Sequence, residues 1–468
     1  MLIFIMLISS TMLTSASYIK SSNQTTTLEN DTADWTVMFY LCCQNHISYE
    51  ADKVINDLLE IGSTSDLNII VLKDQNKDND SRLYYIEKDN LLNLNPVYEW
   101  PDELDMGDPN TLKSFINLVK QNYPAENYAL YLLSDMGSGW QGILHDSGNP
   151  NHGIPLMSIP MFANVFKETT TNNSDKIDVL ILNPCVCGMI ETAYELSPYI
   201  DYLVFSEEHM LEDLDKGPEY ILQYKECLSN LKNNTNMSPE EFALCFTNSY
   251  NPVSFSMWVF YAYMILVKKG EYPPFVKVLS DILTKIFNSL PNKDYHIVEI
   301  KTTLSAINLT RIEDLVNSFS DLVSLLVLHQ DDKDIKNCIK DARGKVREYG
   351  KFYYKNRETA LYYLNFPMEK RAFDSFIDLY NLLELINQTC STLTIKNACE
   401  KVMTEQKNTV IASKALQGDP SHGLSIYFPE NKNLYNKYLW DDKITYKYEE
   451  LNFSTMTHWD DFLKLFLN

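Results

Sequence analysis

Short apolar runs alternate with amphipathic segments along the first half of the chain. The runs are Trp35–Cys43, Leu67–Asp74, Tyr128–Asp135, Ile177–Cys185 and Tyr202–Glu208. Runs of this length are typical of buried strands in a parallel sheet. Between them, apolar residues recur at helical spacing, for example over residues 49–62 and 108–123. The alternation predicts β-α-β connections, and therefore an α/β protein with a mainly parallel sheet flanked by helices.

The second half of the chain follows a helical pattern. From about Ser238, long stretches such as residues 311–330 carry apolar residues at helical spacing. A β-rich run, Gly423–Pro429, interrupts the pattern near the end and could return a strand to the sheet. The expected parts are an α/β domain over residues 35–237 and a largely helical C-terminal region over residues 238–468, with a late strand at 423–429.

The first residues have the pattern of a secretory signal peptide. An apolar run from Leu2 to Ile8 is followed by small and hydroxyl residues up to Ser17. We therefore predict a signal peptide over residues 1–17 and a flexible polar N-terminus over residues 18–34. Export would place the protein outside the cell or in the lumen of the secretory or vesicular pathway. There the N-x-S/T triplets would accept N-glycans. These triplets begin at Asn23, Asn30, Asn79, Asn172, Asn233, Asn236, Asn308, Asn387 and Asn452.

Net charge and hydropathy limit the kinds of molecule that are expected to bind the chain. The chain has 40 Lys and Arg against 63 Asp and Glu, a net charge of −23. Nucleic acids and anionic membranes attract basic surfaces, so neither is expected as the main partner. The best later candidate for a membrane span, Val253–Val267, is shorter than the ~20 residues that a span needs, so we interpret it as a buried helix.

The cysteines indicate neither a zinc site nor a complete set of disulfides. Nine is an odd number, so in an oxidising compartment at least one should keep its thiol, and Cys185 is the candidate. No C-x-x-C pair occurs, so a structural zinc site is not expected.

A glycine-containing turn follows the apolar run Tyr128–Asp135. It reads MGSGWQG, and Gly137 and Gly139 allow the backbone to turn sharply and to approach a ligand closely. Active sites of α/β proteins lie where such strands end. Met136 stands at the start of this turn, and its thioether cannot transfer a proton.

Several separated blocks resemble the clostripain family of cysteine peptidases, relatives of gingipains, legumain and caspases. The blocks are DWTVMFYLCCQN, DMGDPNTLKSFINLVKQNYPAENYALYLLSDMGSGWQG, IDVLILNPCVCGMIETAYELSPYIDYLVFSEE and, near the end, HGLSIYFPE with WDDFL. Together they extend the resemblance over roughly residues 35–467. The resemblance implies a caspase-like sheet.

The resemblance also assigns roles to individual residues. Where the family's turn reads Asp-His-Gly-Ser-Gly-Trp, this chain has Met136 in place of the catalytic histidine. Cys185 stands at the nucleophile position, and Gly137 is the expected oxyanion donor. The family's Asp-Ala-Cys has become Asn183-Pro184-Cys185. Asn183 thus replaces the aspartate that lines a pocket for Arg or Lys side chains.

Residues after the next apolar run are further candidates for contact with a substrate. By the resemblance, Ser206 and Glu207 would line the substrate site. Some family members use calcium, but the chain lacks a D-x-[DN]-x-[DN]-G loop, so no cofactor is predicted and calcium rests on analogy alone.

These departures favour a protein with impaired chemistry. A cysteine of ordinary pKa near ~8.5 is only a few per cent thiolate at neutral pH, and methionine can neither deprotonate it nor protonate a leaving amine. We therefore expect a secreted peptidase homologue that acts by binding a peptide or protein ligand.

Two alternatives remain open. One is an active cysteine endopeptidase with a surrogate base and non-basic specificity, for which His145 and His152, and then His46 and His209, are the candidate bases. The other is a structural or surface-adhesion protein in which the site plays no part.

Overall fold

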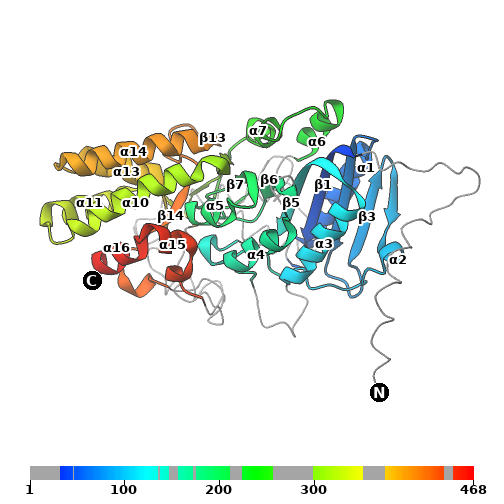
Figure 1. The fold of residues 1–468 in the computed structure, drawn as a ribbon, viewed down its shortest axis with the longest axis horizontal. Coiled ribbons are helices and arrows are strands. Elements are labelled where there is room, and N and C mark those ends of the chain that lie inside the picture. The colour runs from blue at the N-terminus through cyan, green and yellow to red at the C-terminus, as the bar shows by residue number, and fades with distance from the viewer. Residues whose placement is uncertain are drawn as a thin grey trace, which may run out of the picture. The chain divides into compact units, whose positions relative to one another are not determined.

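A nine-stranded sheet forms the centre of the protein (Figure 1). The computed structural model describes residues 32–45, 47–134, 137–146, 156–171, 175–210, 224–256, 299–350, 375–436 and 446–468. The strand order is β13-β10-β7-β6-β5-β1-β2-β3-β4. The bounds are β1 Ala33–Cys42, β2 Leu67–Asp74, β3 Arg82–Glu87, β4 Asn90–Asn93, β5 Ala125–Ser134, β6 Ile177–Leu182, β7 Ile200–Phe205, β10 Leu304–Asn308 and β13 Val410–Lys414. The five middle strands, from β7 to β2, are parallel, and the strands at both edges are antiparallel.

The five predicted strands are the five parallel strands of the sheet. Their apolar runs reflect burial on both faces, because alternate residues of β1 belong to two different hydrophobic cores. Phe39 packs in one core and Tyr40 in the other. The fourth strand ends at Leu182, earlier than predicted, because Pro184 has no backbone N–H to continue the ladder.

Helices cover both faces of the sheet. One core includes residues of α1 Ser48–Ile61, α6 Tyr224–Asn233 and α7 Pro239–Ser249. The other includes residues of α3 Pro109–Asn122, α4 Ile159–Thr169 and α5 Ile190–Leu196. The short α2 spans Asn95–Tyr98. The predicted α/β class with helices on the sheet is therefore confirmed.

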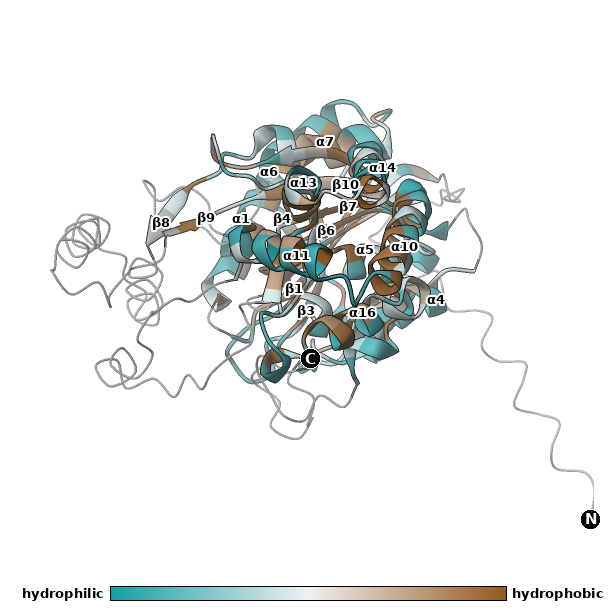
Figure 2. Ribbon diagram, turned by 90° about the vertical axis from the view of Figure 1, so that its left-hand side faces the viewer, coloured by the Kyte–Doolittle hydropathy of each residue, from teal (hydrophilic) through white to brown (hydrophobic). Residues whose placement is uncertain are grey.

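The C-terminal half is mostly helical, as predicted. Its helices are α10 Ile312–Leu328, α11 Lys333–Lys345, α13 Leu379–Thr389, α14 Leu393–Thr409, α15 Asn452–Thr457 and α16 Trp459–Phe466. In Figure 2, α10 and α11 carry both hydrophilic and hydrophobic residues, as their amphipathic sequences require. Cys338 and Cys390 form a disulfide that links α11 to the end of α13.

Strands of this half return to the sheet, although not through the predicted run. β10 pairs with β7, and β13 pairs with β10. The late run instead contributes β14 Ser425–Tyr427 to a three-stranded sheet with β11 Glu348–Tyr349 and β12 Phe376–Asp378. The large sheet therefore takes strands from both sides of the expected boundary at residue 238, and residues 33–468 form one compact unit.

Some predicted segments lie wholly or largely outside the described residues. These are the signal peptide and residues 18–31 of the polar N-terminus, and residues 257–267 of the predicted buried helix. The start of that predicted helix is instead β8 Ser254–Ser256, which pairs with β9 Glu299–Lys301. Within the described part of the chain, no helix has the length and apolar character that a membrane crossing requires.

Candidate functional site

Cys185 lies in the turn that follows β6, at the carboxyl end of a strand in the middle of the sheet. β5 and β7 flank β6 in parallel. Cys185 is partly buried, and the backbone N–H of Met210 donates a hydrogen bond to its Sγ at 3.4 Å. Carboxyl ends of parallel strands are where α/β proteins place their active sites. The position of Cys185 is therefore compatible with the role of a nucleophile.

The backbone next to Cys185 is strained. Val186 is buried and has φ of 51°, in the left-handed region that a β-branched residue rarely adopts. Such a conformation costs of order 1–3 kcal/mol and persists only where its surroundings hold it. Here the N–H of Val186 donates to the carbonyl oxygen of Glu208 at 3.1 Å, and that of Gly188 donates to Ser206 at 2.7 Å. The segment after β7 therefore fixes the turn that carries the thiol.

The glycine turn after β5 lies directly against this turn. A Cβ atom added to Gly137 would come within 2.0 Å of the backbone oxygen of Cys185 and 2.7 Å of Cys187 Sγ. Only glycine fits such a close approach of two backbones. The two strand ends therefore meet, as the sequence pattern predicts, and Gly137 is beside the nucleophile position.

Several predicted site residues lie outside the described part of the chain. They are Asp135, Met136, His46 and His152. The orientation of Met136 toward Cys185 therefore stays a prediction, which rests on the position of its neighbour Gly137.

The C-terminal half packs onto the glycine turn. Gly139, with φ of 58°, begins a short 3-10 turn that ends at Gln141, and a Cβ atom on it would lie 2.5 Å from Met189 Sδ. Trp140 is fully buried, and its ring is 5.1 Å from that of Tyr448. Residues distant in sequence therefore pack around the glycine turn after β5.

The residues predicted to line a substrate pocket are buried. Asn183 is 2% exposed, and its Oδ1 accepts a hydrogen bond from the hydroxyl of Tyr131 at 3.2 Å. Ser206 Oγ donates to the backbone oxygen of Glu208 at 2.9 Å. Glu207 Oε2 accepts from the backbone N–H of Gly423 at 3.1 Å. In this structure, these side chains face the interior; direct contact with a substrate therefore remains a prediction.

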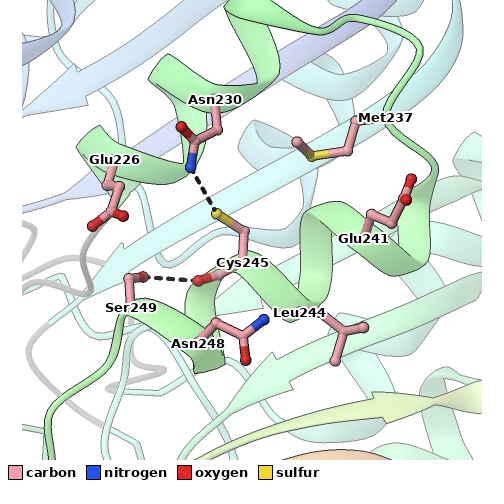
Figure 3. Close-up of a pocket in the computed structure, with 8 residues that line it drawn as sticks. All are labelled: Glu226, Asn230, Met237, Glu241, Leu244, Cys245, Asn248 and Ser249. Carbon is pink, nitrogen blue, oxygen red and sulfur yellow. Dashed lines mark hydrogen bonds between the residues drawn. The ribbon is translucent and has the colours of Figure 1, made fainter.

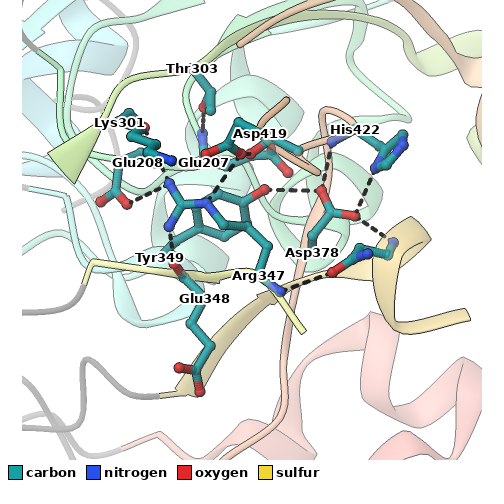
Figure 4. Close-up of polar contacts among 12 residues, drawn as sticks. Glu207, Glu208, Lys301, Thr303, Arg347, Glu348, Tyr349, Asp378, Asp419 and His422 are labelled. Carbon is teal, nitrogen blue, oxygen red and sulfur yellow. Dashed lines mark hydrogen bonds and ion pairs between the residues drawn. The ribbon is translucent and has the colours of Figure 1, made fainter. Parts of the chain in front are cut away.

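Glu207 belongs to a buried polar network behind the site (Figure 4). Burial raises the pKa of Glu207 well above its ordinary range, and the neighbouring carboxyl group of Asp378 raises it further. Asp378 in turn accepts a hydrogen bond from the hydroxyl of Tyr349 at 2.9 Å and from the backbone N–H of His422 at 2.6 Å. The buried surroundings of Glu207 therefore favour its protonated form.

Glu208 is charged but balanced by an arginine. Arg347 Nη2 lies 3.3 Å from Glu208 Oε2, and Arg347 Nε lies 3.2 Å from Asp419 Oδ1. Both carboxylates are almost completely buried. The backbone N–H of Gly350 donates to Glu208 Oε1 at 2.9 Å, and that of His209 donates to it at 3.0 Å. The network therefore ties β11 to the segment that contacts the thiol.

Two of the candidate surrogate bases are described. His209 is 5% exposed, burial lowers the pKa of its imidazole, and it directly precedes Met210, whose N–H contacts the thiol. His145 is partly buried. Its backbone N–H donates a hydrogen bond to Oγ of Ser134, at the end of β5, at 3.3 Å. Of these two histidines, His209 is therefore the one whose direct neighbour in the chain contacts the Cys185 thiol.

The electrostatics around Cys185 provide little negative charge for a basic side chain. Asn183 carries no charge, the raised pKa of Glu207 favours its protonated form, and Glu208 is paired with Arg347. Among the residues that the structure describes, no group of three or more His, Cys, Asp or Glu side chains could hold a metal ion. The arrangement therefore offers little uncompensated negative charge behind the turn that carries the thiol.

A buried glutamate joins the helix after Cys185 to the C-terminal half. Glu191 Oε1 accepts hydrogen bonds from the Tyr427 N–H at 2.8 Å and the Tyr448 hydroxyl at 2.7 Å. Burial raises the pKa of Glu191 to about 7. Between its ordinary pKa and 7, the folded protein holds a proton that the unfolded chain releases, so this group's stabilising contribution is lost as pH rises through that range.

We expect Glu191→Gln to remove this pH dependence. As pH rises from 4.5 to 8, the free energy of unfolding of the variant should rise by about 2–3 kcal/mol relative to that of wild type. Urea titrations across this range measure the difference. Glu126→Gln, which changes an exposed carboxyl group on β5, is the matched control. Parallel profiles for wild type and Glu191→Gln would contradict the prediction.

Several residues of the site were not identified from sequence. Glu208, Arg347, Asp378 and Glu191 act through partners that lie far away along the chain; Arg347 and Glu208 are 139 residues apart. Only Glu208 carries a local signal, because it follows a buried apolar run directly, as Ser206 and Glu207 do.

Comparison with known proteins supports the fold and identifies a family. A profile of the clostripain family matches residues 39–466. Clostripain from Hathewaya histolytica is 26% identical over 194 residues, which are 35% of this chain and 36% of that protein. The match thus spans about a third of the length of that relative.

Two solved structures share the fold. A secreted C11 cysteine protease from Bacteroides thetaiotaomicron, in complex with an irreversible peptide inhibitor, has a TM-score of 0.55 at 16% identity, covering 92% of this chain and 100% of that chain. An inactive zymogen C11 protease from Parabacteroides distasonis has a TM-score of 0.54 at 16% identity, covering 91% and 98%. The caspase-like fold class predicted from sequence is confirmed.

Proposed function

Because the chain belongs to the clostripain family, we propose that it is a secreted peptidase homologue with impaired chemistry, which binds a peptide or a protein partner around Cys185. The observation that carries this proposal is the Met136 substitution next to Gly137. Gly137 touches the backbone of Cys185, and by the resemblance the residue before it in the sequence stands at the position of the family's catalytic base. A thioether provides no proton transfer, and losing a general base commonly costs ~10²–10⁴-fold in rate.

Three observations support secretion. Residues 1–17 have the pattern of a signal peptide. The disulfide between Cys338 and Cys390 suits an oxidising compartment. The relative from Bacteroides thetaiotaomicron is described as secreted. Of the glycosylation triplets in the described part of the chain, Asn79, Asn233, Asn236 and Asn452 are exposed and could carry glycans.

A peptide is the favoured ligand class because a peptide inhibitor occupies that same relative. The scarcity of uncompensated negative charge behind Cys185 favours peptides without Arg or Lys at the contact point. Asn183 carries no charge and the raised pKa of Glu207 favours its protonated form, so neither offers a counter-charge to a basic side chain, and burying such a charge unpaired is costly.

Cys185 provides the direct test of this function. We expect wild type to cleave a peptide panel no faster than Cys185→Ala, while both proteins bind peptides of the panel with similar affinity. Turnover is measured by mass spectrometry of the products, and binding by calorimetry. Robust wild-type cleavage that Cys185→Ala abolishes would refute the impaired chemistry, and an absence of peptide binding would refute the ligand class.

A second candidate function is an active peptidase with non-basic specificity, which the position of His209 favours. If His209 served Cys185, His209→Gln should abolish any cleavage that Cys185→Ala abolishes. Loss in both variants with retained folding would establish this alternative.

A further inference from the structure

Two cysteines face one another on the helix pair α6–α7, on the sheet face that also carries α1. All nine cysteines lie in the described part of the chain, and of these only Cys185 and Cys245 are partly exposed. Cys245 is on α7, and Cys227 is on the facing side of α6. Cys227 contacts Ser249, which lies one turn after Cys245 on α7, and Cys245 contacts Asn230, which lies one turn after Cys227 on α6. Cys227 therefore stands directly behind the exposed thiol.

A solvent-open pocket of about 420 Å³ gives access to Cys245 (Figure 3). Asn230 Nδ2 donates to Cys245 Sγ at 3.6 Å, and Cys227 Sγ lies 3.7 Å from Ser249 Oγ. The pocket's wall also includes two exposed carboxylates, Glu226 and Glu241. A small molecule can therefore reach Cys245 but not the buried Cys227.

The surroundings of the two thiols differ, so that Cys245 is suited to attack a disulfide and Cys227 to resolve the product. The neighbouring Cys227 thiol, together with the hydrogen bond from Asn230, lowers the pKa of Cys245 below its ordinary value. Burial raises the pKa of Cys227 well above its ordinary value. The thiolate is the nucleophile in thiol–disulfide exchange, so Cys245 reacts first.

We propose that Cys245 and Cys227 form an oxidisable dithiol whose substrate is a small-molecule disulfide entering the α6–α7 pocket. The Cys245 thiolate attacks one sulfur of the disulfide RSSR; a protein–SR bond forms, the S–S bond of RSSR breaks, and RS⁻ leaves and takes up a proton. The Cys227 sulfur, losing its proton to solvent, then attacks Cys245 Sγ and displaces the second RS⁻. The sum is protein(SH)₂ + RSSR → protein(S–S) + 2 RSH.

The pocket's charge selects among such disulfides. Glu226 and Glu241 give it a negative wall, so a cationic disulfide accumulates there and an anionic one is repelled. Cystamine should therefore react faster than oxidised glutathione. The product joins α6 to α7 without involving Cys185, so this site is separate from the proposed peptide-binding function.

The test uses the full chain carrying Cys185→Ala, so that the other partly exposed thiol does not react. After treatment with cystamine, peptide mapping without reduction should recover the peptides of Cys227 and Cys245 joined by a disulfide. With Cys227→Ser the reaction should stop at a mixed disulfide of Cys245 with cysteamine, one half of cystamine. Cys245→Ser should yield neither product, and Cys399→Ser, at a buried thiol on α14, should react as the parent does.

Two results would overturn the proposal. One is a folded parent protein that forms neither adduct nor cross-link; the other is an adduct that forms first on Cys227. The selection by charge has its own readout, since Glu226→Gln should reduce the cystamine rate several-fold and leave the rate with a neutral disulfide unchanged. An equal loss with both reagents would refute the charge argument.

Discussion

Met136→His is expected to raise Cys185-dependent peptide hydrolysis by about 10²–10⁴-fold over wild type. The physical reason is that Cys185 lies at the end of a strand, but the position of the family's catalytic histidine is taken by a residue that cannot accept the thiol proton. Gly137 lies against the backbone of Cys185, so an imidazole on the preceding residue would start from backbone adjacent to the thiol. Methionine is flexible and of similar volume to histidine, so the exchange should be sterically mild.

The measurement compares turnover of one peptide panel by wild type, Met136→His and the double variant Met136→His with Cys185→Ala. The matched control is Met136→Gln, which adds a polar side chain of similar size without a base. Only Met136→His should gain activity, and the gain should disappear in the double variant. Equal rates for Met136→His and Met136→Gln, in proteins of unchanged stability, would show that the turn does not direct this side chain at the thiol.

The parallel strands could be predicted because burial on both faces leaves a continuous apolar run in the sequence. The edge hairpin of β3 and β4 was not predicted, since its apolar runs are short and much of the hairpin is only partly buried or exposed. β10 and β13 are short strands within a helical half. β10 pairs with β7 and β13 pairs with β10, each with a partner about a hundred residues earlier in the chain, and no local pattern carries that information.

The core of the site was predictable for a related reason. The carboxyl ends of β5 and β6 must lie at one edge of the sheet, which brings Gly137 to Cys185. The surroundings were not predictable. Ser206 and Glu207 follow a strand and so resemble substrate contacts, but both are buried, and burial together with Asp378 of β12 raises the pKa of Glu207. Protonation and burial depend on contacts between segments that are far apart in the chain, and the local sequence does not reveal these contacts.

Arg347→Met is expected to lower the free energy of unfolding by about 3–5 kcal/mol, because it leaves two buried carboxylates without their cation. Arg347 is the shared partner of Glu208 and Asp419, and its guanidinium also lies 4.7 Å from the ring centre of Tyr349. Methionine keeps most of the side-chain volume, so the loss should reflect charge and hydrogen bonding more than a cavity.

Urea unfolding at neutral pH measures the effect, and Lys345→Met is the matched control. Lys345 pairs with Asp341 on the exposed surface of α11, so its loss should cost less than about 1 kcal/mol. Because Glu208 accepts the N–H of His209 and its backbone oxygen accepts that of Val186, Arg347→Met should also loosen the segment that holds Cys185. Labelling of Cys185 by iodoacetamide should then become faster in Arg347→Met but not in Lys345→Met. A stability loss no larger than the control's would mean that water or relaxation compensates the two carboxylates, and that the network does not hold the thiol in place.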